Sequence, residues 1–246
     1  MEHMLGRRVL VTRAADDNGP WVERLLSLGA EPVPLPCISI EKLTPFDSWL
    51  DALNSATWVA FTSHRAVRLF SELLGEGNLA NQLIAAIGPS TRAACMDSFG
   101  RCDLSSEHGT GSDLAKRLAS KVTKNTSVLL PGAAEPRPEL SRELTEAGVQ
   151  AVPLPLYATR PAKASTERAD MRGALDAALF ASPSAISGCF GTAMISSTLP
   201  ASCIGPTTAN AARDAGLKNV YTSDTRDLDG LLRALREPLD TSPHSS

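Results

Sequence analysis

The stretch Val33-Pro34-Leu35-Pro36 recurs as Val152-Pro153-Leu154-Pro155, an offset of 119 positions. The offset holds outward in both directions, where it pairs Val9-Leu10-Val11-Thr12-Arg13 with Val128-Leu129-Leu130-Pro131-Gly132, and Phe61-Thr62-Ser63 with Phe180-Ala181-Ser182. Further along, Ile87-Gly88-Pro89-Ser90-Thr91 matches Ile204-Gly205-Pro206-Thr207-Thr208 at an offset of 117, which is one short loop deletion. A pattern that repeats in order over this distance indicates an internal duplication.

Each copy alternates strand and helix patterns. Arg8–Thr12 is a short run rich in β-branched residues, typical of a buried parallel strand. Pro20–Leu28 carries Trp21, Leu25 and Leu28 at helical spacing. Further strands are expected at Glu31–Leu35, Trp58–Phe61 and Ile84–Ile87, and further helices from Ser63 or His64, at Ser90–Phe99 and at Asp113–Leu118. The alternation predicts an α/β fold of doubly wound parallel sheets covered by helices.

Prolines mark two equivalent extended segments. They stand at Pro32, Pro34 and Pro36 in the first copy and at Pro153, Pro155 and Pro161 in the second. Proline at alternate positions suits edge segments with few ladder donors. We interpret both segments as crossovers between two lobes, with Cys37–Leu43 and Leu156–Arg160 running side by side.

Composition excludes several classes of partner and site. The net charge of −3 gives no global attraction to nucleic acid or to anionic membranes. The five cysteines have no C-x-x-C spacing, which favours reduced core thiols and no metal site. No apolar stretch approaches the ~20 residues of a membrane helix, and Met1–Arg8 does not resemble a signal peptide. We expect a cytoplasmic protein.

Hydroxyl, glycine and arginine residues gather directly after the predicted strands. Ligands of open α/β sheets bind beyond the carboxyl ends of the strands, and helix N-termini there favour anions. The candidate binding residues are Thr12, Arg13, Thr62, Ser63, His64, Arg65, Gly88, Ser90, Thr91, Ser182, Pro183, Ser184, Gly205, Thr207 and Thr208. The alternative for each hydroxyl residue is a plain helix cap, worth about 1 kcal/mol.

Tyr157 is the candidate catalytic residue. It is one of two tyrosines and lies on the second crossover; the alternative is that its ring only packs, with the hydroxyl in water. His64 could transfer protons or simply be exposed at a helix start. Nucleophile-elbow, phosphate-loop and complete dinucleotide signatures are absent. An enzyme of this kind would need a substrate that is itself reactive.

Six short motifs in register resemble uroporphyrinogen-III synthases. They are Val9 to Arg13 (VLVTR), Phe61 to Val67 (FTSHRAV), Ile87 to Thr91 (IGPST), Pro153 to Thr159 (PLPLYAT), Phe180 to Ser184 (FASPS) and Ile204 to Ala209 (IGPTTA). The resemblance runs in order from about Arg8 to Leu235. It implies two lobes, residues 1–37 with 160–236 and residues 42–154, joined by a two-stranded ladder of 38–41 and 155–159. The tail 237–246 is expected to be disordered.

The resemblance also implies an activity. The family cyclises hydroxymethylbilane to uroporphyrinogen III and water, with inversion of ring D and without a cofactor. Tyr157 matches the tyrosine considered to assist hydroxyl departure, and the matching cleft positions are Thr62, Ser63, Arg65, Ser182, Ser184, Thr207 and Thr208. His64 departs from the common proline or small residue, and Pro131-Gly132 from a frequent arginine-glycine pair.

The resemblance further favours a monomer whose partners are its small-molecule substrate and, transiently, the preceding pathway enzyme, with no nucleic acid and no membrane. Two alternatives stay open. One is a two-lobed ligand-binding or regulatory module of the same fold without turnover. The other is a nucleotide-utilising enzyme, which the missing phosphate loop disfavours.

Overall fold

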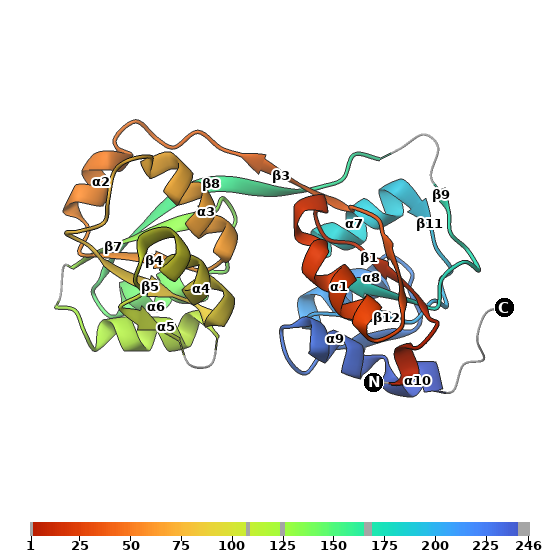
Figure 1. Ribbon diagram of the computed structural model, residues 1–246. Helices are drawn as coiled ribbons and strands as arrows, with labels where there is room; N and C mark the ends of the chain where they lie inside the picture. The colour runs from red at the N-terminus through yellow and green to blue at the C-terminus, as the bar shows by residue number, and fades with distance from the viewer. Residues whose placement is uncertain (1, 107–108, 124–125, 165–168, 241–246) are drawn as a thin grey trace. The chain divides into compact units, whose positions relative to one another are not determined.

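The computed structural model describes residues 2–106, 109–123, 126–164 and 169–240. The chain divides into two compact units, Met1–Ile40 with Thr159–Ser246 (unit 1) and Glu41–Ala158 (unit 2), each considered by itself (Figure 1). Each unit is a parallel sheet with helices on both faces, extended in unit 2 by one antiparallel strand, so the doubly wound α/β class is confirmed. No helix in the described residues is long and apolar enough to cross a membrane.

The sheet of unit 1 has the strand order β13-β12-β10-β1-β2, and every pairing in it is parallel. Its strands are β1 Arg8–Val11, β2 Glu31–Pro34, β10 Ala177–Phe180, β12 Ala201–Cys203 and β13 Val220–Thr222. Its helices are α1 Gly19–Ser27, α7 Pro183–Thr192, α8 Pro206–Asp214, α9 Leu228–Ala234 and α10 Arg236–Asp240, with 3-10 turns at Glu2–Met4 and Ala15–Asp17. A separate two-stranded pair joins β9 Ala169–Asp170 to β11 Ala193–Met194.

Alternate side chains of these strands fill two cores, one on each face of the sheet. Leu10 and Phe180 pack with residues of α7 and α8. Val9, Val11 and Leu179 pack on the other face with residues of α1, α9 and α10. Because both faces are covered, the strands read as continuous apolar runs in the sequence.

Unit 2 repeats this architecture. The six-stranded sheet has the order β3-β8-β7-β4-β5-β6, from β3 Ile38–Lys42, β8 Gln150–Pro161, β7 Ser127–Ala133, β4 Trp58–Phe61, β5 Leu83–Ala86 and β6 Leu104–Ser105. Its helices are α2 Trp49–Ser55, α3 His64–Leu74, α4 Gly88–Phe99, α5 Gly111–Ala119 and α6 Glu139–Glu146. One face buries Trp58 with α5 and α6. The other packs Phe61 against Phe70 and Phe99, with ring centroids 5.6 and 5.7 Å away.

Strand register confirms the duplication. Arg8 of β1 pairs with Glu31 of β2, and their equivalents 119 positions later, Ser127 of β7 and Gln150 of β8, pair likewise. Val9 pairs with Ala177 on the other side of β1, just as Val128 pairs with Trp58 on the other side of β7. Each sheet therefore combines the first two strands of one copy with the later strands of the other, which is why the chain passes twice between the units.

The two passages are β3 and β8, which are neighbours in the sheet. Leu43 N donates to Leu156 O at 2.9 Å, and Ala162 N donates to Cys37 O at 2.8 Å, so the two strands run in opposite directions. β2 is an edge strand, as its prolines predict.

The structure differs from the sequence expectation at some element ends. α4 begins at Gly88 rather than Ser90, because Pro89 in its first turn needs no amide partner. Residues 237–240, expected to be disordered, lie in α10, where Leu239 is buried and its carbonyl accepts a hydrogen bond from Arg7 Nη2 at 2.7 Å. The rest of that expected tail, 241–246, lies outside the described residues.

Candidate active site

The strand order reverses once in each unit, and the candidate residues follow the strands at these points. In unit 2 the chain builds outward from β4 through β5 to β6, then returns to β7 and β8 on the other side of β4. In unit 1 the reversal lies between β1 and β10. Such a switch point leaves a crevice at the carboxyl ends of the strands, where ligands of open α/β sheets bind.

A hydrogen-bonded Ser63–Tyr157 pair lies beside the switch point of unit 2. Ser63 has an extended backbone and caps α3, where its Oγ accepts from Ala66 N at 3.2 Å. The same Oγ lies 3.2 Å from Tyr157 Oη. Tyr157 is on β8, and its side chain is buried, with 6% of the residue exposed. The phenol is therefore held at the N-terminus of α3, where the helix dipole favours negative charge.

A β-bulge decides which face of β8 carries Tyr157. Gly132 of β7 pairs with Pro155, but the next residue, Ala133, pairs with Tyr157 instead of Leu156. A one-residue shift exchanges the two faces of a strand, and bulges re-aim side chains in this way beside functional sites. Ala134 N then donates to Tyr157 O at 2.8 Å, which fixes the strand beyond the bulge.

Arg65 covers the ring of Tyr157. Its guanidinium carbon lies 5.2 Å from the ring centroid, within the range of a cation–π contact. Arg65 comes from the first turn of α3 and is half-buried, whereas His64 before it is exposed. Arg65, a candidate binding residue in the sequence, thus lies beside the tyrosine.

Neighbouring turns of unit 2 contribute exposed groups. Thr62 is exposed, and its Oγ1 would lie 3.9 Å from a Cβ added to Gly132. Beside it, Ile87 N donates to Phe61 O, and α4 then begins at Gly88, whose φ of 77° suits glycine. Ser90 in the first turn of α4 is exposed. Gly88 N donates to Ser106 Oγ at 3.2 Å, a partner that the sequence did not indicate.

In unit 1 the equivalent turn is a second capped helix start. Ser182 Oγ accepts from Ala185 N at 3.2 Å at the start of α7, with Pro183 exposed and Ser184 half-buried. Gly205 precedes α8, whose Thr207 is exposed. These positions present helix N-termini to solvent.

Arg13 is held in place by its neighbours in unit 1. Its guanidinium carbon lies 4.7 Å from the Trp21 ring centroid, and its Nη2 lies 3.7 Å from Asp17 Oδ2. Any anion that binds Arg13 would add to these contacts.

Three of the candidate threonines are buried. Thr12, Thr91 and Thr208 are 0%, 4% and 3% exposed. Thr12 Oγ1 donates to Leu179 O at 2.7 Å, so this hydroxyl ties β1 to β10. For Thr12 this hydrogen bond accounts for the buried hydroxyl without a ligand, because buried polar groups need a partner.

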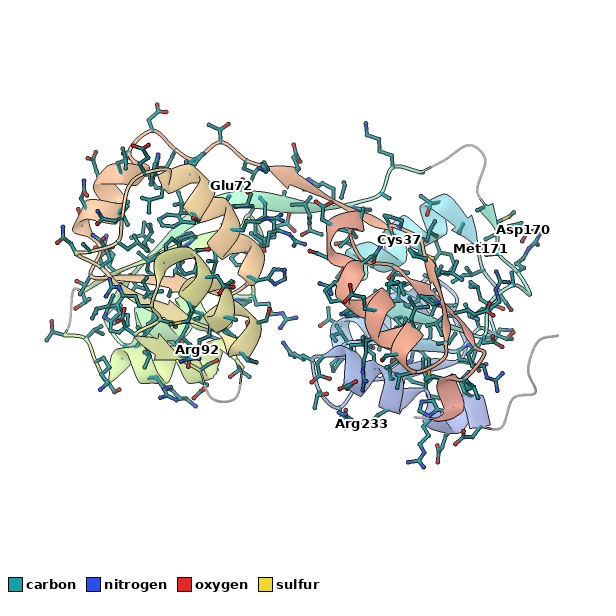
Figure 2. The ribbon with its side chains drawn as sticks, in the orientation of Figure 1. Cys37, Glu72, Arg92, Asp170, Met171 and Arg233 are labelled. Atoms are coloured by element: carbon teal, nitrogen blue, oxygen red, sulfur yellow. The ribbon has the colours of Figure 1, made fainter. Side chains whose placement is uncertain are left out.

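One thiol has an unusual environment, away from the tyrosine site. Cys102 is half-buried, whereas the other four cysteines are buried. A hydrogen bond from Cys95 is the main cause that lowers the pKa of Cys102 to about 7, helped by the Leu104 backbone and by Arg92 on α4 (Figure 2). Burial raises the pKa of Cys203 to about 12. The sequence expectation of five equivalent core thiols misses Cys102.

Comparisons with known proteins match most of the chain. The family model for uroporphyrinogen-III synthase HemD matches residues 19–233. The porphyrin biosynthesis protein HemD of Ruminiclostridium josui is 28% identical over 95% of this chain and 49% of its own length, so the chain spans about half of that relative. The chloroplastic uroporphyrinogen-III synthase of Oryza sativa subsp. japonica is 28% identical over 94% of this chain and 80% of its own length.

A solved structure shares the fold. A mutant uroporphyrinogen III synthase of the extremely thermophilic bacterium Thermus thermophilus aligns with 96% of this chain and 100% of its own, at 21% identity and a TM-score of 0.59. Because the family model covers both copies of the duplicated pattern, from α1 to α9, the chain belongs to the uroporphyrinogen-III synthase family.

Proposed function

We propose that this chain is a uroporphyrinogen-III synthase, which converts hydroxymethylbilane into uroporphyrinogen III and water with inversion of ring D, a step towards haem, sirohaem and cobalamin. The observation that carries the proposal is the family match over residues 19–233. The proposal concerns this reaction alone and not the remaining half of the longer relative.

Tyr157 is the proposed acid. Its phenol donates a proton to the departing hydroxyl, the C–O bond breaks, and water leaves. The resulting electrophilic carbon is attacked by the substituted α-carbon of ring D, which gives a spiro intermediate. The bond from this α-carbon to the ring C methylene then breaks, and the methylene is attacked by the other α-carbon of ring D, so that the ring is inverted. That second α-carbon releases a proton that restores the phenol. General acid catalysis of this kind raises the rate by ~10²–10⁴-fold. Holding the two ends of the substrate in the reacting orientation lowers the activation free energy by ~7–11 kcal/mol. The support is a buried phenol held at a helix N-terminus.

The substrate carboxylates are proposed to bind at the exposed strand-end turns. The proposed binding residues are Arg13, Thr62, Ser63, His64, Arg65, Gly88, Ser90, Ser182, Pro183, Ser184, Gly205 and Thr207. Helix N-termini and arginines together favour anions. Raising the ionic strength should therefore raise KM for hydroxymethylbilane, because salt screens exposed charges. A salt-insensitive KM would argue against this binding mode.

We also propose that units 1 and 2 are the two lobes expected from the sequence, and that the protein is a cytoplasmic monomer which needs no cofactor and meets the preceding pathway enzyme transiently. Equal specific activity across a wide range of protein concentration would support the monomer. Activity that falls on dilution would contradict it.

The test is an isomer analysis. The purified protein is given fresh hydroxymethylbilane with no added cofactor, and the oxidised products are separated into uroporphyrin I and III. Type III in excess is expected, since unaided closure gives type I. Only type I, at the protein-free rate, would favour the inactive binding module. Tyr157→Phe should slow turnover, while Tyr221→Phe, which removes the other tyrosine from β13, is the matched control.

A further inference from the structure

The Ser63 hydroxyl makes two contacts, and both bear on Tyr157. Ser63 Oγ lies 3.2 Å from Ala66 N and 3.2 Å from Tyr157 Oη. An amide N–H can only donate, so Ala66 takes one lone pair of the serine oxygen. The hydroxyl keeps its proton and one further lone pair for Tyr157. The direction of that second hydrogen bond decides what the phenol can do.

The two directions are not equivalent once substrate is present. If Tyr157 donates to Ser63, the phenol proton is held by the serine oxygen and is not available to the departing hydroxyl. If Ser63 donates to Tyr157, the phenol proton is directed to the departing hydroxyl and every group in the pair is satisfied. Only the second arrangement leaves the phenol proton free for the substrate while the phenol oxygen keeps a hydrogen bond, so a general acid at Tyr157 requires it.

The second copy of the duplicated pattern has the capping serine but not the contact with a tyrosine. Ser182, 119 positions after Ser63, caps α7 with nearly the same backbone angles and the same 3.2 Å bond from Ala185 N. The position equivalent to Tyr157 in the first copy is Ile38, which has no hydroxyl. A capping serine is thus common to both copies, whereas its hydrogen bond to a phenol occurs in one.

We propose that Ser63 is a positioning residue that donates its hydroxyl proton to Tyr157 Oη, so that the phenol keeps its own proton for the departing hydroxyl of the substrate. The contact of Arg65 with the ring face fixes the same phenol at a second point. This inference rests on the proposed synthase activity for its catalytic consequence, but the direction of the hydrogen bond exists without turnover.

Three substitutions of Ser63 distinguish the roles of its oxygen and its proton. Ser63→Ala removes both the cap and the donor. Ser63→Asp keeps an excellent cap but has no proton to donate, and Ser63→Thr keeps both functions. We expect kcat to fall by about tenfold or more in the alanine and aspartate variants, part of the ~10²–10⁴-fold that a general acid supplies. These kcat values are compared at saturating substrate, because Ser63 is also among the proposed carboxylate-binding residues and its replacement raises KM as well. The threonine variant should recover most of kcat.

Thr110→Ala is the control for a lost cap. Thr110 Oγ1 accepts from Asp113 N at 3.2 Å at the start of α5 in the same unit. This variant should lower the urea midpoint about as much as Ser63→Ala does while kcat is unaffected. A kcat loss that tracks stability alone, equal in both variants, would overturn the proposal.

The hydrogen-bond direction is measured without substrate. Tyr157 is the only tyrosine in a Tyr221→Phe background, so the C–O stretch of its phenol can be assigned in infrared spectra with ring-labelled tyrosine. We expect the signature of an accepting phenol, lost in Ser63→Ala and Ser63→Asp and kept in Ser63→Thr. A donating phenol in the unsubstituted serine protein, or wild-type kcat in Ser63→Asp, would overturn the inference. If no type III product forms while the accepting signature stands, the proposed function fails and the hydrogen-bond assignment survives.

Discussion

Gly188 of α7 packs directly on backbone, and Gly188→Ala tests that packing. A Cβ added there would lie far inside van der Waals contact of Cys37 O and 2.9 Å from Ala162 N. These two atoms are the acceptor and donor of the 2.8 Å hydrogen bond that joins the two crossing segments. Figure 2 shows Cys37 beside α7. Because both neighbours are backbone atoms, no rotation of a side chain can relieve the clash, so α7 or the segments must move.

The expected cost follows from three effects. Overpacking a tight site costs about 1–3 kcal/mol, and weakening the Ala162–Cys37 hydrogen bond costs about 1 kcal/mol. Alanine is favoured over glycine inside a helix by about 1 kcal/mol, and this gain offsets the cost of the weakened hydrogen bond. We therefore expect Gly188→Ala to lower the free energy of unfolding by about 1–3 kcal/mol.

Gly191 supplies the matched control on the same helix. A Cβ added to Gly191 would meet Ala164 Cα at 3.4 Å and Ala164 Cβ at 3.5 Å, which are ordinary contacts. Gly191→Ala should gain up to about 1 kcal/mol from helix propensity alone. Urea unfolding followed by circular dichroism compares the two variants, with unchanged m-values as the condition for converting midpoints into free energies. Equal midpoints would refute the packing of α7 described above.

Three further outcomes are expected. Cys102 should be alkylated by iodoacetamide about tenfold faster at pH 8 than at pH 6, levelling off above pH 8, because its pKa of about 7 is crossed and the thiolate reacts; a rate that still climbs steeply above pH 8 in peptide mapping would contradict this. Asp176→Asn should cost up to about 3–5 kcal/mol in urea unfolding, because it removes the carboxylate that lies 3.2 Å from the buried guanidinium of Arg7; a loss below about 1 kcal/mol would show that the pair is solvated. Thr12→Val should cost about 1 kcal/mol for its bond to Leu179 O and leave KM unchanged; a raised KM would return Thr12 to the binding residues.

Much of the fold was predictable because the duplicated pattern sets strand register twice. The apolar runs of β1 and β7 bury both faces, and the equivalent pairings Arg8 with Glu31 and Ser127 with Gln150 follow. Two-residue strands such as β6 were not predictable, since two residues show no periodicity. Nor was α10, whose burial depends on Arg7, far away in the sequence.

The candidate site was predictable by position but not by orientation. The hydroxyl residues stand at strand ends as expected, yet Thr12 faces the sheet and Ser63 faces Tyr157. Orientation within a turn depends on a rotation of one residue, which composition and spacing do not encode. Ser63 and Tyr157 are 94 positions apart in the sequence, and their contact depends on the bulge opposite Ala133. No local sequence pattern therefore predicts it.

The bulge is a structural difference between the two halves of the duplicated fold. Both copies supply a strand, a capping serine and a helix N-terminus with the same geometry. The register of β7 with β8 shifts by one residue between Gly132 and Ala133, which turns Tyr157 towards Ser63. The equivalent strand β1 ends at Val11, before the position that corresponds to this shift, and Ile38 stands where the phenol would be. Duplication thus provides two anion-favouring helix starts, while the bulge and one tyrosine confine the proposed proton donor to unit 2.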